Sequence, residues 1–215
     1  MWVVISGING TGKTSLKEKL EIYFGEKGYT IINFKVPFHN WVTEMITLSG
    51  EGKSHGDPYT DELIFAASHR LESGMIKKWR AKYDILISKR FWGDQIPYAE
   101  VKGVPSRLIR TLTRYSELEK PDMIFFLDCE AEVALSRSKR KSKYEYLEFM
   151  QPLRVNYLRF IDELKDSKIP ELKDTPYYLI DACKSLDLVY EEIRDIIEAY
   201  ILENNIKPKI KEKEI

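Results

Sequence analysis

One stretch near the N-terminus has a residue spacing that is typical of phosphate binding. Residues 7–14 match the pattern G-x-x-x-x-G-K-[ST], in which glycines shape a tight loop whose backbone N–H groups surround a phosphate at a helix N-terminus. We therefore predict that Lys13 bridges the β- and γ-phosphates of a nucleoside triphosphate, and that the Thr14 hydroxyl ligates Mg²⁺. The residues expected to contact the nucleotide are Gly7, Ile8, Asn9, Gly10, Thr11, Gly12, Lys13, Thr14 and Ser15.

Short apolar runs alternate along the chain with longer segments whose apolar residues have helical spacing. Strands are predicted at residues 2–5, 30–34, 84–87, 123–127 and 177–180, and helices at 13–27, 39–50, 59–80, 95–117, 130–163 and 184–203. This alternation is typical of parallel strands joined by crossover helices. We expect an α/β fold with a doubly wound parallel five-stranded sheet and helices on both faces.

Composition and charge exclude several classes of protein. The 215 residues carry 34 basic and 34 acidic side chains, and 43% are hydrophobic, which supports a folded core and argues against a nucleic-acid-coating protein. No apolar run approaches the ~18 residues that cross a bilayer. Cys129 and Cys183 are too few for a disulfide framework, and both are interpreted as small buried residues. We expect one cytoplasmic domain over 1–215, with no membrane or nucleic-acid partner and a frayed charged tail over 205–215.

The phosphate-loop pattern is shared by several enzyme classes. A GTPase should carry an N-K-x-D sequence, which is absent from the chain. Motor and AAA-type ATPases place a carboxylate at the end of a neighbouring strand. Asp128 fits that position, but the interpretation that it caps a helix starting near Glu130 is favoured. Because the chain is too short for a second lobe, a small phosphotransferase is the preferred class.

Several motifs resemble the thymidylate kinase family of nucleoside monophosphate kinases, over nearly the whole chain. The loop G-I-N-G-T-G-K-T-S is similar to the family's G-I-D-G-x-G-K-[ST]-[ST], and residues 121–137 resemble its P-D-L-x-x-x-L-D…E-x-A-L-x-R segment. Residues 65–70 resemble its substrate helix, residues 88–91 with Tyr98 its D-R-Y…A-Y segment, and residues 180–182 its I-D-A. The resemblance implies transfer of the ATP γ-phosphoryl to a pyrimidine deoxynucleoside monophosphate (dTMP to dTDP), with Mg²⁺, by a homodimer.

The resemblance also implies the catalytic residues, which are Lys13, Arg90, Arg137 and Arg140. Arg90 would grip the acceptor phosphate, while Arg137 and Arg140 would reach the transferring group from a lid around residues 137–148. Guanidiniums suit these roles, because transfer between phosphates gathers negative oxygens that must be neutralised. The lysines among residues 137–143 are better explained as a solvated helix end, and no aromatic residue interleaves these cations as nucleic-acid binding would favour.

The acceptor base should, by the same resemblance, lie against an aromatic ring of the substrate helix. Phe65 and Arg70 are candidates, but five residues separate them where the family has four. Either Phe65 pairs with His69, or the register shifts and Ala66 replaces the ring. Tyr98 supplies a second aromatic wall or packs in the core. The expected substrate-binding residues are Pro37, His39, Phe65, His69, Arg70, Arg90 and Tyr98.

Two carboxylates of the family pattern are missing. Asn9 replaces the loop Asp and keeps an acceptor oxygen, whereas Lys89 replaces the Asp before Arg90 and reverses the charge near the metal. We expect Lys89 to point to solvent or to a carboxylate, and Asp94 is a candidate to compensate for the lost charge. These departures leave two alternatives open: a deoxynucleoside kinase or other small phosphotransferase of the same fold, and a nucleotide-binding protein that has lost catalysis.

Overall fold

The computed structural model describes residues 1–42, 44–45, 57–138 and 144–209, and its centre is one five-stranded sheet. The strands lie in the order β2-β3-β1-β4-β5, and every neighbouring pair is parallel. This arrangement confirms the predicted sheet. Its strands are β1 (Trp2–Ser6), β2 (Ile31–Lys35), β3 (Ile85–Lys89), β4 (Met123–Asp128) and β5 (Tyr177–Asp181).

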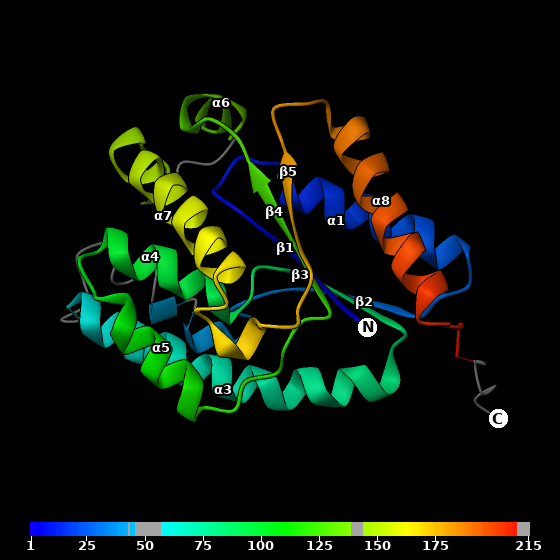
Figure 1. Ribbon diagram of the computed structural model, residues 1–215, viewed down its shortest axis with the longest axis horizontal. Coiled ribbons are helices and arrows are strands. Elements are labelled where there is room, and N and C mark those ends of the chain that lie inside the picture. The colour runs from blue at the N-terminus through cyan, green and yellow to red at the C-terminus, as the bar shows by residue number, and fades with distance from the viewer. Residues whose placement is uncertain (43, 46–56, 139–143, 210–215) are drawn as a thin grey trace.

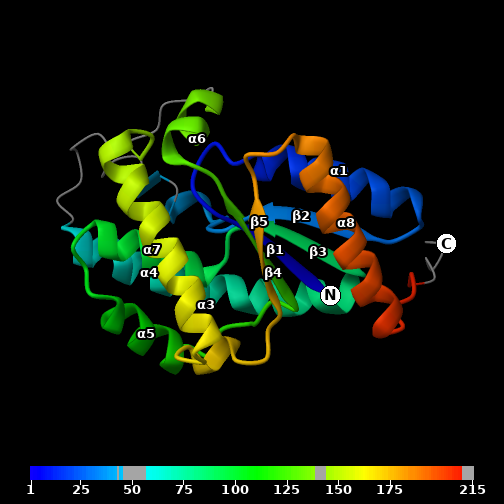
Figure 2. The ribbon, with the colours of Figure 1, turned by 45° about the horizontal axis from the view of Figure 1, so that its top comes forward.

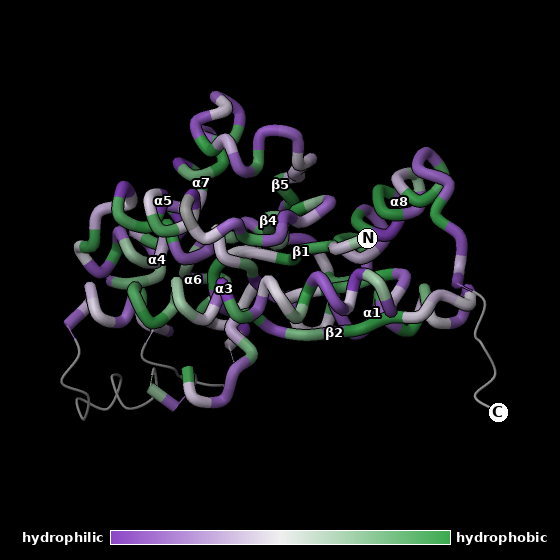
Figure 3. The backbone as a smooth tube through the Cα atoms, turned by 90° about the horizontal axis from the view of Figure 1, so that it is seen from below, coloured by the Kyte–Doolittle hydropathy of each residue, from purple (hydrophilic) through white to green (hydrophobic). Residues whose placement is uncertain are grey.

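Helices cover both faces of the sheet (Figure 1). The first face carries α1 (Lys13–Glu26) and α8 (Leu186–Glu203). The second face carries α3 (Pro58–Lys82), α4 (Gln95–Val101), α5 (Ser106–Tyr115) and α7 (Leu147–Lys165). Figure 3 shows the same separation from below, with α1 and α8 at one end of the molecule and α4, α5 and α7 at the other. The short helix α6 (Ala131–Arg137) and the 3₁₀ turns η1 (Trp92–Asp94) and η2 (Pro170–Leu172) complete the described elements.

Alternate strand residues supply two separate cores, because successive side chains of a strand point to opposite faces. Val3 and Ile5 of β1 pack with α1 and α8, whereas Trp2 and Val4 pack with the helices of the second face. All five residues of β1 are buried. Burial on both faces explains why the strands read as continuous apolar runs rather than as alternating patterns.

Two predicted helices are interrupted in the structure. The segment 95–117 divides into α4 and α5, because Gly103 has a φ of +81° and Pro105, which precedes α5, has no N–H to donate. The segment 130–163 divides into α6 and α7, since Tyr146 at the start of α7 is extended. The predicted helix 39–50 falls partly outside the described residues.

Part of the tail that we expected to be frayed is packed against the domain. The carbonyl of Ile206 accepts a hydrogen bond from Tyr29, and Lys209 donates from its backbone N–H to Asp84 at 2.9 Å. The Lys209 ammonium also donates to three carbonyls at the C-terminal end of α3. Residues 210–215 lie outside the described residues. Among the described helices, none is long and apolar enough to cross a membrane.

Because the strands are parallel, their carboxyl ends meet at one edge of the sheet. The loop from β1 to α1 lies at this edge beside α6 (Figure 2), together with the residues that follow β3, β4 and β5. In open α/β sheets this edge is the usual place for a ligand, at the point where the strand order reverses. Here that point is β1, between β3 and β4.

Candidate active site

The loop between β1 and α1 is shaped by glycines that larger residues cannot replace. Gly7 and Gly10 have φ values of +125° and +85°. A Cβ on Gly7 would lie 2.4 Å from the carbonyl oxygen of Leu127, and one on Gly10 would lie 1.9 Å from that of Ala134. No side chain caps the N-terminus of α1, which leaves its first amide groups available to an anion.

Lys13 is buried and lies back across the loop. Its ammonium donates hydrogen bonds to the Ile8 carbonyl and, at 3.2 Å, to the Thr11 hydroxyl. Burial, with the positive charges of Arg90 and Lys89, lowers the pKa of Lys13 well below its ordinary value. A bound phosphate would raise this pKa again, because a nearby negative charge favours the ammonium form. The loop is therefore electrostatically suited to an anionic ligand.

Arg90 connects the end of β3 to the phosphate loop. Its φ of +74° is rare for a residue with a side chain, and such strain concentrates at functional sites. The guanidinium donates to Asn9 at 2.7 Å, to the Tyr98 hydroxyl at 2.6 Å and to the Tyr157 hydroxyl at 2.9 Å. It also lies 4.8 Å from the centre of the Tyr98 ring. Arg90 is thus held in one position beside the loop.

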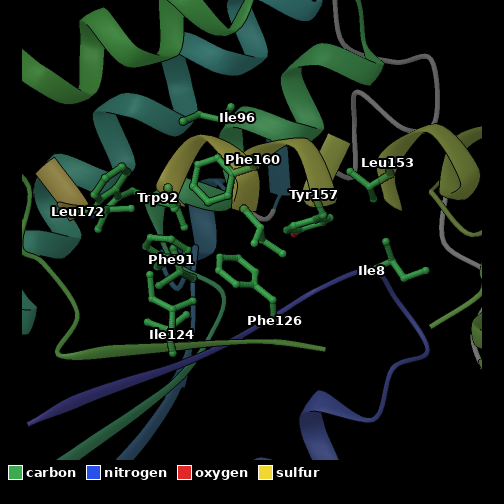
Figure 4. Packing of buried hydrophobic residues seen from close by; sticks show 14 of the residues in the cluster. Ile8, Phe91, Trp92, Ile96, Ile124, Phe126, Leu153, Tyr157, Phe160 and Leu172 are labelled. Carbon is green, nitrogen blue, oxygen red and sulfur yellow. The ribbon is translucent and has the colours of Figure 1, made fainter. Parts of the chain in front are cut away.

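Asp94 completes this network from inside the protein. The carboxylate is buried, accepts from the Phe91 N–H at 2.9 Å, and accepts further hydrogen bonds from the hydroxyls of Ser6 and Tyr157. Figure 4 shows Tyr157 extending from α7 into the same cluster as Phe126 of β4 and Ile8 of the loop. Asp94 lies 3.4 Å from Arg90. Its oxygens are engaged in holding Arg90, and they do not replace the missing carboxylate near Thr14.

Lys89 faces the phosphate loop, so the expectation that it points away is wrong. Its ammonium donates to the Thr14 hydroxyl at 3.0 Å. The reason is strand alternation: Ile85, Ile87 and Lys89 point to one face of β3, and the two isoleucines pack with α1. Burial, followed by the charges of Lys35 and Arg90, lowers the pKa of Lys89 to about 8.

These contacts do not fit a magnesium ion held by the protein. The Thr14 hydroxyl, the predicted ligand, accepts a hydrogen bond from the Lys89 ammonium, and the largest charge effects on that ammonium come from two further cations, Lys35 and Arg90. Within the described part of the chain, no group of three or more His, Cys, Asp or Glu residues could hold a metal.

The residues around the predicted lid contact two different loops. Asn9 donates to Glu145 at 3.2 Å, and Ser138 donates to the same carboxylate at 2.5 Å, so Glu145 is hydrogen-bonded both to the phosphate loop and to the residue that follows α6. The guanidinium of Arg137 instead donates to the carbonyls of Ala182 at 2.5 Å and Cys183 at 3.0 Å, between β5 and α8. Arg140 lies outside the described residues.

Arg154 is a site candidate that the sequence did not indicate. From α7 it forms a bidentate ion pair with Asp128, at 2.7 and 2.9 Å, and it also contacts Glu130. The interpretation of Asp128 as a helix cap is therefore wrong, and α6 has no side-chain cap. Arg154 and Asp128 line a small pocket with Gly7 and Tyr157. No local pattern around Arg154 distinguishes it from a surface arginine.

On α3, the ring of Phe65 stacks with that of His69, which is the first of the two predicted registers. Their centres are 6.4 Å apart and their planes differ by 24°. His69 also contacts the buried carboxylate of Glu72 at 3.0 Å, and Glu72 accepts from the Phe38 N–H at 2.8 Å. Glu72 therefore joins α3 to the segment that follows β2, a role that its sequence position did not reveal.

The other predicted substrate residues are dispersed. Pro37 follows β2 through a cis peptide bond, and the His39 ring lies beside those of Phe38 and Trp41. Arg70 is exposed and donates to the Glu117 carbonyl at 3.4 Å, so it is not brought together with the stacked Phe65 and His69 rings.

Tyr98 packs among other aromatic side chains, which is the second of the two roles considered for it, and it also contacts Arg90. Its ring packs against Tyr144 and Phe149, with centres 5.9 and 6.0 Å away, while its hydroxyl accepts from Arg90.

A family model described as thymidylate kinase matches residues 5–193. The chain belongs to the thymidylate kinase family. Similar proteins include the probable thymidylate kinases of Staphylothermus marinus, at 27% identity over 94% of this chain and 96% of the relative, and of Methanocaldococcus jannaschii, at 29% over 90% and 93%. The thymidylate kinase of Thermosipho africanus is 25% identical over 94% of this chain and 99% of its own length. Members of this family use ATP as the phosphate donor.

Proposed function

We propose that this chain transfers the γ-phosphoryl group of ATP to dTMP and forms dTDP. The observation that carries the proposal is the hydrogen bond from Arg90 to Asn9, because it joins a fixed guanidinium to the phosphate loop. Family membership over residues 5–193 supports the same activity, as do the names of the similar proteins.

In this reaction the loop from Gly7 to Ser15 binds the donor phosphates, and Lys13 stabilises the charge that develops between the β- and γ-phosphates. Arg90 orients the acceptor phosphate, whose oxygen is already an anionic nucleophile. No general base is needed, so catalysis consists of positioning and charge neutralisation. Arg137 and Arg140 act from the lid. Their positions in the family pattern support this role, which requires Arg137 to leave its carbonyl partners.

The acceptor nucleoside is assigned to the region between α3 and Arg90. The stacked Phe65 and His69 rings supply a flat surface for a base, and Tyr98, whose ring lies against the Arg90 guanidinium, is included on its family position. Pro37, His39 and Arg70 are included on their family positions alone. Any magnesium arrives with the nucleotide, because the cations around Thr14 do not offer it a site.

A deoxynucleoside kinase is not favoured. That reaction deprotonates a hydroxyl and needs a carboxylate near Arg90, whereas Lys89 stands at that position and Asp94 is already hydrogen-bonded to Ser6 and Tyr157. A binding protein without catalysis is disfavoured by the intact loop, in which Lys13 and Thr14 are both present.

We also propose a homodimer, located in the cytoplasm, formed by a second copy packing on α3. Tyr59, Leu63, Leu71 and Met75 are exposed apolar side chains with spacings of four and eight residues, and they share one face of this helix. Replacing Leu63 and Leu71 with glutamate should convert a dimer to a monomer in sedimentation measurements.

The experiment that tests the activity is a turnover screen with ATP and every common nucleoside and nucleoside monophosphate as acceptor. We expect dTMP to give the highest kcat/KM. Turnover of a deoxynucleoside without turnover of any monophosphate would contradict the proposal, as would nucleotide binding without any turnover.

A further inference from the structure

Cys129 and Cys183 lie together although they are 54 positions apart in the chain. Cys129 directly follows β4, and Cys183 is two residues beyond β5. The Ala182 N–H donates to the Asp128 carbonyl at 2.8 Å, so the two segments stay paired past the ends of their strands. The Sγ atoms are 3.1 Å apart, which shows that the two side chains point toward each other. A disulfide requires about 2.05 Å, so the atoms need to approach by only about 1 Å.

The two thiols differ in their access to solvent. Cys183 is exposed, and Cys129 is buried. Burial, together with the hydrogen bond to Cys183, raises the pKa of Cys129 to about 12, so this thiol is unreactive by itself. When an exposed thiol lies beside a buried one, the exposed sulfur reacts first with an oxidant. The buried sulfur then attacks the oxidised sulfur and forms a disulfide with it.

We propose that Cys129 and Cys183 are an oxidation site that closes to an intrachain disulfide by exchange with a small disulfide such as oxidised glutathione. The Cys183 thiolate attacks the glutathione disulfide, forms a mixed disulfide and releases one glutathione. The Cys129 sulfur, after losing its proton to water, then attacks Cys183 and releases the second glutathione. Two protein thiols are oxidised, and one molecule of oxidised glutathione is reduced to two thiols.

The bond would join the carboxyl ends of β4 and β5 beside the phosphate loop. A Cβ on Gly7 would lie 2.4 Å from the Leu127 carbonyl oxygen, so the phosphate loop lies close to the end of β4, and Arg137 donates to the carbonyls of Ala182 and Cys183. A disulfide here would therefore fix the segment between β5 and α8 against the strand that supports the loop. It would also restrict the unfolded chain, because it closes a loop of more than fifty residues.

Thiol counting on the native wild-type protein tests this proposal directly, because the chain has two cysteines in total. After incubation with oxidised glutathione, we expect both thiols to be lost and the mass of the intact monomer to fall by about 2 Da. The melting temperature should rise by roughly 5–15 °C and return to its original value with dithiothreitol.

The single variants separate this bond from other products. Cys129→Ser should retain one glutathione on Cys183, whereas Cys183→Ser should leave Cys129 unmodified until the protein is unfolded. Two thiols that persist in the oxidised native protein would overturn the proposal. A stable mixed disulfide in the wild type, or a dimer that dithiothreitol separates, would overturn it equally. None of these readouts depends on kinase activity, so they stand apart from the proposed function.

Discussion

Replacing Lys89 by methionine should weaken the binding of ADP in the absence of divalent cations. The ammonium lies 3.0 Å from the Thr14 hydroxyl, and Thr14 is in the loop that binds phosphate. A phosphate at this hydroxyl lies about 5 Å from the charge, where one pair of unit charges at an effective dielectric of 20 contributes about 3 kcal/mol. Because Lys89 is only partly buried, solvent reduces this to about 1–2 kcal/mol, or a five- to thirtyfold loss of affinity.

Isothermal titration of ADP in EDTA, at low and high ionic strength, measures this effect. The difference between wild type and Lys89→Met should shrink at high salt. Lys19→Met is the matched control, because the Lys19 ammonium pairs with Asp187 at 2.6 Å rather than with a residue of the phosphate loop, and this variant should bind ADP like wild type. Lys89→Asp should lose more affinity in EDTA and recover it with Mg²⁺. Unchanged or tighter ADP binding by Lys89→Met in EDTA would refute the reasoning.

Three further outcomes are expected. Lys13→Ala should abolish phosphoryl transfer and leave the circular dichroism spectrum unchanged, and wild-type turnover would refute its role. Arg90→Ala should weaken dTMP binding by roughly 1.5–3 kcal/mol with little effect on ADP. Titration measures both affinities beside the control Arg194→Ala, whose guanidinium pairs with Asp195 on α8, and equal losses for both nucleotides would place Arg90 elsewhere. Gly10→Ala should lower the free energy of unfolding by about 2–4 kcal/mol, because the new Cβ would clash with the Ala134 carbonyl and because the φ of +85° disfavours a side chain. Chemical denaturation measures this loss, and a wild-type midpoint would contradict it.

The sheet and the phosphate loop could be predicted because their signals are local. The central strands β1, β3 and β4 are apolar runs that are buried on both faces, and the glycine spacing of residues 7–14 directly reflects the backbone that the loop requires. Gly103 and Pro105 are residues that commonly interrupt helices. The apolar residues on either side of them nevertheless have continuous helical spacing, which predicted a single helix.

Some contacts were predictable in principle. Ile85, Ile87 and Lys89 alternate along β3, so Lys89 is directed toward α1 like the two isoleucines. The expectation that Lys89 points away considered only its repulsion by nearby positive charges. The two cysteines follow neighbouring parallel strands, and the strand order β4-β5 brings them together. The hydrogen bond between Asn9 and Arg90, by contrast, joins residues that are 81 positions apart, and it depends on the positive φ of Arg90. No pattern in the neighbouring sequence predicts either the contact or the φ.

The central claim is that the chain phosphorylates dTMP although Asn9 and Lys89 replace two carboxylates of the family pattern. The measurement that tests it most directly is the chromatographic detection of dTDP formed from dTMP and ATP by purified wild type, with Lys13→Ala prepared in parallel to exclude a contaminating kinase. The account predicts multiple turnovers of dTDP by the wild type and none by the variant. Absence of dTDP from a wild-type protein that binds both nucleotides would contradict it.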